Sequence, residues 1–159
     1  MRSIRNLKKI TFLLALIVAL FSFTASSINV QAKLTDNEDK FIKTITKDFI
    51  ATHNLNLDSY NFFDLRDIYL NKDNLTTQEK SIINIYMSIV KKQDYIDCSP
   101  LLYVNETDNK GYVLEKKVNG MNNLHILSYD NENQIWKVTN KNNKMGKDIV
   151  ELGLLKNSK

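Results

Sequence analysis

The chain has 159 residues, a formal net charge of +4 and one cysteine, Cys98. A single cysteine excludes an internal disulfide and a cysteine metal cluster, so a hydrophobic core must hold the fold together. Four of the 22 basic residues and none of the 18 acidic residues lie within positions 1–32, so residues 33–159 have no net charge. This neutrality argues against a nucleic-acid partner, because phosphate binding needs a clustered basic surface.

The N-terminus has the three parts of a secretory signal. It opens with four cations, Arg2, Arg5, Lys8 and Lys9. The apolar run that follows, 10–23, is shorter than the ~20 residues that span a bilayer as a helix, which leaves an uncleaved anchor as the weaker alternative. Small side chains at Val30 and Ala32 suit a signal peptidase, so we place the cleavage between Ala32 and Lys33. Residues 33–159 are then one exported, extracytoplasmic domain that meets the membrane only through its signal before cleavage.

A capping box marks the start of the first predicted helix. Thr35 and Glu38 have the spacing at which a hydroxyl and a carboxylate each accept a hydrogen bond from a free backbone N–H. Apolar residues then recur at helical spacing, which predicts a helix over 36–52. The aromatic-rich segment 53–75 fits neither the helical nor the strand period, and we expect a short strand or a helical turn near 60–70.

The second predicted helix begins in the same way. Thr76 and Glu79 repeat the capping-box spacing, and a strong apolar stripe follows them. These features predict a helix over 77–95. Pro100, the only proline in the chain, is expected to open the segment that follows.

Beyond that proline the apolar pattern changes to period two, which is typical of half-buried strands. Four strands are predicted, at 101–105, around 112–118, at 124–129 and at 135–139. Turn signals separate them, of which Asn119-Gly120 is the clearest because both residues tolerate positive φ. The strands therefore form an antiparallel meander, and the tail at 149–155 adds a short helix or an edge strand. Helices followed by a meander predict an α+β fold with both N-terminal amphipathic helices covering one face of the sheet.

This order of elements resembles the small exported NTF2-like, cystatin-like domains of Gram-positive bacteria. The turn and strand at 133–138, Asn-Gln-Ile-Trp-Lys-Val, carry the resemblance most clearly. It implies an N-terminal helix packed into a curved antiparallel sheet. A third helix, usual in that family, is not evident in 53–75. The family includes isomerases, dehydratases and non-enzymatic binding modules, so the resemblance does not itself assign a function.

Three residues are candidates for lining a cavity between helix and sheet: Tyr86, His125 and Trp136. His125 is predicted mid-strand, on the same face as Leu127 and Tyr129, where it could contact a ligand or act as a general base. Trp136 is the only tryptophan, and we expect it to cover the core where the sheet meets a helix, with a cavity wall as the alternative.

The other reactive side chains fit structural roles better. Two carboxylate pairs have a spacing of three, Asp64 with Asp67 and Asp94 with Asp97. Such pairs are usually solvated unless their environments differ. Cys98 has no histidine in its sequence context, and the adjacent Asp97 would raise its pKa. His53 follows the first helix, where a cation is favourable. No spacing predicts a metal or a cofactor.

The sequence therefore predicts a secreted, non-enzymatic binding or accessory module at the cell envelope. Its partner would be a small molecule, a cell-wall component or an envelope protein, bound in the helix–sheet cavity. One alternative is a small isomerase- or hydrolase-type enzyme that uses His125 with Asp94 or Asp97. Another is a secreted inhibitor or immunity protein that acts through loops 105–111 and 129–134.

Overall fold

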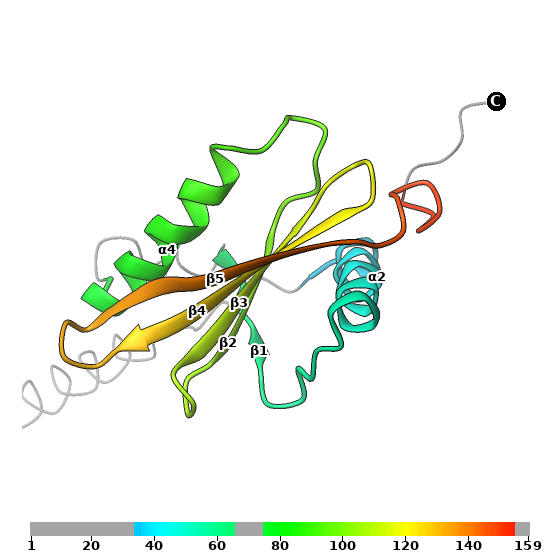
Figure 1. The fold of residues 1–159 in the computed structure, drawn as a ribbon. Helices are drawn as coiled ribbons and strands as arrows, with labels where there is room; N and C mark the ends of the chain where they lie inside the picture. The colour runs from blue at the N-terminus through cyan, green and yellow to red at the C-terminus, as the bar shows by residue number, and fades with distance from the viewer. Residues whose placement is uncertain (1–33, 66–74, 155–159) are drawn as a thin grey trace, which may run out of the picture. The chain divides into compact units, whose positions relative to one another are not determined.

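The computed structural model describes residues 34–65 and 75–154. These residues form an α+β fold of two α-helices and a five-stranded antiparallel sheet (Figure 1). The predicted signal, its cleavage site at Ala32 and Lys33, and Asp67 lie outside the described residues. In the described part, no helix combines the length and the apolar character needed to cross a membrane.

Both helices begin at the predicted capping boxes. Helix α2, Asp36–His53, starts after Thr35, whose hydroxyl accepts from the Glu38 amide while the Glu38 carboxylate accepts from the Thr35 amide at 2.8 Å. Helix α4, Thr77–Val90, has the same reciprocal pair between Thr76 and Glu79. Each box satisfies backbone donors that the first helical turn leaves free.

Helix α4 ends five residues before the predicted boundary, at Val90 rather than at position 95. The chain beyond it turns, and the Asp97 carboxylate accepts the amides of Asp94 and Val118 at 3.1 Å each. These bonds attach the turn after α4 to the segment around Val118, further along the chain. The prediction was wrong here because tertiary hydrogen bonds compete with the helical pattern.

Five strands form the sheet, not the four that were predicted, and they lie in the order β1-β2-β3-β4-β5. Their bounds are β1 Asn61–Phe62, β2 Leu101–Asn105, β3 Lys110–Lys116, β4 Met121–Asp130 and β5 Ile135–Met145. Strands β2 to β5 are the predicted meander. The additional strand β1 precedes α4 in the chain and pairs with β2, so the helices do not both precede the sheet. The tail forms turns instead of a helix or strand, and Ile149 is buried there.

The two helices lie on opposite faces of the sheet, which corrects the prediction of one covered face. Helix α4 packs on alternate residues such as Leu102, Val113 and Leu127. Helix α2 packs on the intervening ones, such as Leu101 and Leu114. All five residues of β2 are buried, so both faces of this strand need cover.

Candidate functional site

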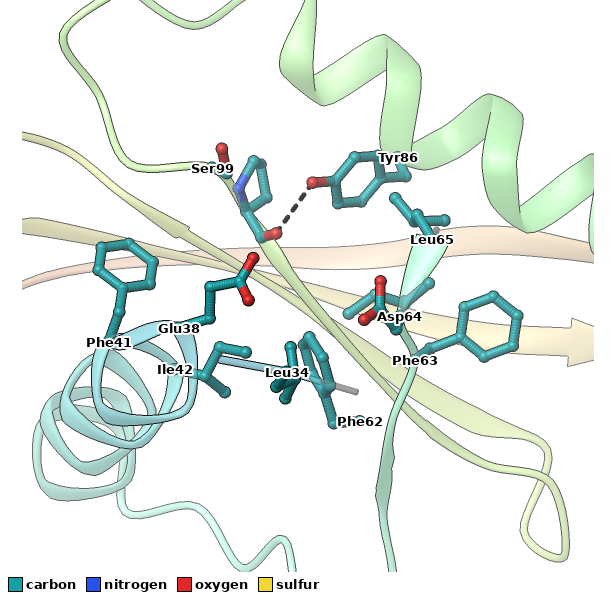
Figure 2. A pocket seen from close by; sticks show the side chains of 12 residues that line it. Leu34, Glu38, Phe41, Ile42, Phe62, Phe63, Asp64, Leu65, Tyr86 and Ser99 are labelled. Carbon is teal, nitrogen blue, oxygen red and sulfur yellow. Dashed lines mark hydrogen bonds between the residues drawn. The ribbon is translucent and has the colours of Figure 1, made fainter. Parts of the chain in front are cut away.

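The first cavity lies where the N-terminal end of α2, the segment after β1, helix α4 and the start of β2 meet (Figure 2). Its volume is about 360 Å³. Apolar side chains form most of its wall: Leu34, Phe41, Ile42, Phe62, Phe63, Leu65, Pro100 and Leu102. Polar groups are few and come from Glu38, Asp64, Tyr86 and Ser99. Sites for small ligands combine these two kinds of lining.

Tyr86, one of the three predicted cavity residues, lines this first cavity. Its hydroxyl donates a hydrogen bond to the Pro100 carbonyl at 3.0 Å, which Figure 2 shows as a dashed line. Burial raises the pKa of Tyr86, so the hydroxyl stays protonated at neutral pH. Tyr86 therefore fixes the position of α4 against the start of β2 and presents a neutral polar group to the cavity.

A second cavity, of about 450 Å³, lies beside the N-terminal end of α4, on the other side of Phe63. Trp136, the second predicted residue, lines it and is only 4% exposed. The indole packs in the cluster under α4 and lies 5.5 Å from the Tyr129 ring, measured between centroids. The backbone amide of Trp136 also donates to the Ser81 hydroxyl of α4 at 2.8 Å. Trp136 is thus both a core residue and a cavity wall.

His125, the third predicted residue, lies against neither cavity. It is on the α4 face of β4, as its predicted alternation requires, and it is 7% exposed. Its Nε2 atom lies 2.8 Å from Glu115 Oε2 on β3. The structure therefore separates the three predicted cavity residues, and it pairs His125 with a carboxylate that sequence reasoning did not select.

A chain of charged groups continues from this pair. Glu115 also contacts Lys117 Nζ at 3.1 Å, and the same ammonium lies 2.6 Å from Asp97 Oδ2. Burial by itself would raise the pKa of Glu115, but hydrogen bonds from His125, Lys117 and Asn123 outweigh it and lower the pKa to about 2. Asp97, proposed as a partner of His125, thus reaches it only through Lys117 and Glu115. This arrangement holds charges in place rather than exposing them to a substrate.

The environments of Cys98 and His53 favour structural roles over reactive ones. Burial, the largest cause, raises the pKa of Cys98, which disfavours a nucleophilic thiolate. His53 stacks on Phe49 with ring centroids 5.7 Å apart, and its Nε2 lies 3.2 Å from the Asn122 carbonyl. Burial lowers the pKa of His53, so a helix-stabilising cation, as expected from sequence, is disfavoured. Asp64 lines the first cavity apart from Asp94 and Asp97.

A buried polar cluster on the α2 face of the sheet was not predicted from the sequence. The Lys116 side chain is fully buried, and its Nζ donates to Asp48, Gly120 and Asn122 at 2.7–3.0 Å. Asn122 also donates to Asp48 at 2.7 Å. Burial alone would raise the pKa of Asp48, but these partners lower it. The cluster joins α2 to the β3–β4 hairpin.

Within the described residues, no group of three or more His, Cys, Asp or Glu side chains has an arrangement that could hold a metal ion. No family model, curated protein or solved structure matches the chain. The site must therefore be interpreted from its own geometry.

Proposed function

We propose that this chain is an exported, non-enzymatic binding module that takes an apolar group of an envelope component into the first cavity. The observation that supports this most directly is the cavity itself, about 360 Å³ with a largely apolar wall and a few polar groups. That volume is in the range of known small-molecule sites. An acyl chain or an aromatic side chain would remove apolar surface from water there, at roughly 25 cal/mol per Å².

A binding role agrees better with the geometry than catalysis does. A catalytic histidine must reach the reacting group directly or through one water. His125 lines neither cavity, and its Nε2 is engaged by Glu115. An NTF2-like fold, with a helix packed on an antiparallel sheet and a cavity at their junction, remains the structural part of this proposal.

A cavity-filling variant tests the binding site. The probe is N-phenyl-1-naphthylamine, an uncharged apolar fluorophore. Ile42→Trp places a larger side chain in the wall and should weaken probe binding at least several-fold. Ile50→Trp makes the same change on the same helix at a position that is 37% exposed, outside the cavity, and should bind the probe like the parent.

Ser99→Trp provides a second blocking variant, because Ser99 lines the cavity but is exposed and outside the helices and strands. Circular dichroism should show that all three variants are folded. If the probe binds equally to the parent, to Ile42→Trp and to Ser99→Trp, the cavity is not the binding site and the proposal fails.

Export is a separate part of the proposal. Expression of the full chain in a Gram-positive host should release a product whose intact mass is that of a chain starting at Lys33. A mass that retains residues 1–32 in the released protein would contradict the proposed cleavage after Ala32.

A further inference from the structure

The second cavity has the composition of a cation site. Three aromatic rings line it, from Phe63, Tyr129 and Trp136. Two carboxylates, Glu79 and Glu106, line it as well, and Lys, Arg and His are absent among its described lining residues. Aromatic faces and carboxylates both attract positive charge, and neither attracts an anion.

The rings form a corner rather than one flat surface. The planes of Tyr129 and Trp136 meet at 51°, with their centroids 5.5 Å apart. Trp136 is almost fully buried, whereas Tyr129 and Phe63 are half-buried. The indole therefore lies deepest, and the other two rings rise toward solvent. A compact cation in such a corner can contact more than one ring.

The carboxylates lie nearer to solvent than the indole. Glu106 is exposed, and its carboxylate has no hydrogen-bond or ion-pair partner among the described residues. Glu79 is half-buried, and its carboxylate accepts from the Thr76 amide and hydroxyl at 2.8 Å each. Both of these partners are neutral groups. The two negative charges therefore remain at the cavity, where a cation would gain Coulomb energy.

The N-terminal end of α4 also borders this cavity, and a helix N-terminus by itself favours anions. The capping box weakens that preference, because Thr76 and Glu79 already satisfy each other's backbone N–H groups. The Glu79 carboxylate also opposes the positive end of the helix dipole. An anion would have to enter against two carboxylates, so a cation fits better.

We propose that the second cavity binds an organic ammonium group, with the rings of Trp136 and Tyr129 around the cation and Glu106 at the mouth. A quaternary ammonium and a lysine-type primary ammonium share this chemistry. The site is distinct from the first cavity, because Phe63 is the only described residue that lines both.

Trp136 reports on this site directly, since it is the only tryptophan in the chain. Choline is titrated at constant ionic strength while Trp136 emission is recorded. The neutral carbon isostere 3,3-dimethyl-1-butanol is titrated in parallel. Choline should change the emission with saturation, and the isostere should bind about five-fold more weakly or worse, because it lacks the charge.

Two variants locate the cation. Glu106→Gln should weaken choline binding about five-fold, and Tyr129→Leu should weaken it at least as much. Glu132→Gln removes an exposed carboxylate in the β4–β5 turn, outside the cavity, and should bind choline like the parent. N-acetyl-lysine amide, titrated in a separate arm, tells whether the site prefers a primary or a quaternary ammonium.

Three results would overturn the proposal. The first is saturable binding of choline and its isostere with equal affinity, and the second is no saturable response to choline or to the lysine amide. An equal loss in Glu106→Gln and Glu132→Gln would do the same, because it indicates general charge attraction. Since N-phenyl-1-naphthylamine reports the first cavity and Trp136 emission reports the second, either proposal can fail without the other.

Discussion

Lys116 is the residue whose environment departs most from what its sequence suggests. It stands between Glu115 and Lys117 in a run of charges that is typical of a solvated surface. Instead its side chain is fully buried, with three hydrogen-bond acceptors around Nζ. A buried ammonium is tolerated only when its charge and its three donors are satisfied, and here they are.

Lys116→Met keeps the length of the side chain and removes its charge. The change leaves the Asp48 carboxylate, which is 6% exposed, without its cation. We expect a loss of about 3–5 kcal/mol in the free energy of unfolding, measured by urea denaturation. The double variant Asp48→Leu with Lys116→Met removes both charges and should recover part of that loss. If the loss in the free energy of unfolding of the double variant equalled the sum of the losses of the two single variants, the pair would not be coupled.

The lowered pKa of Glu115 predicts that the protein loses stability in acid. Its pKa is about 2 in the folded protein, against an ordinary 4.5. A carboxyl group whose pKa is lowered by folding stabilises the protein above the ordinary value, and the stabilisation is lost as the pH falls toward the folded value. The free energy of unfolding should therefore decline between about pH 4.5 and pH 2.

Glu115→Gln should be less stable than the parent at pH 7 and should show a shallower decline between pH 4.5 and pH 2. Glu132→Gln changes an exposed carboxylate in the same way and should keep the parent slope. Urea denaturation at several pH values gives both slopes. A Glu115→Gln slope equal to that of the parent would mean that other carboxylates cause the decline.

The N-terminal caps show how local sequence stabilises a helix. Thr76→Ala removes the hydroxyl that accepts from the Glu79 amide at 3.2 Å. We expect it to lower the free energy of unfolding by about 1 kcal/mol. Thr76→Ser keeps the oxygen and should stay much closer to the parent in the same denaturation experiment. Equal losses in both variants would assign the effect to the methyl group instead of the cap.

Elements with local signals were predicted well from the sequence. The capping boxes, the period-two pattern and the Asn119-Gly120 turn act within a few residues, and the structure confirms both helix starts and the meander. The sequence left a short strand and a helical turn as alternatives near 60–70, because the two residues of β1 are defined by pairing with β2, about forty positions later in the chain. The early end of α4 likewise depends on Asp97 and the distant Val118.

The candidate site was harder to predict from the sequence than the fold, for the same reason. Cavity walls assemble from α2, β1, α4 and β2, and no local pattern states how these elements meet. Tyr86 and Trp136 line two different cavities, and His125 lines neither. Glu79 of α4 and Glu106, which follows β2, line the second cavity together only because the fold brings these two distant positions to it.

At the scale of the whole molecule, the sheet is shared by two cores on opposite faces. One contains Ile82 of α4, and the other contains Ile45 of α2. Adjacent residues of β2 and β3 alternate between the two cores. Neither core can therefore lose its strands without exposing the other, which predicts cooperative unfolding.

Ile45→Ala and Ile82→Ala test this coupling, because each opens a cavity in one core. Each should lower the free energy of unfolding by about 2–5 kcal/mol. Trp136 emission reports the α4 face, and far-ultraviolet circular dichroism reports all helices and strands. Within each protein, parent or variant, the two signals should change at the same urea concentration, although this midpoint should be lower in the variants than in the parent. If Ile45→Ala shifted the circular dichroism transition and left the Trp136 transition in place, the two faces would unfold independently and the shared sheet would not couple them.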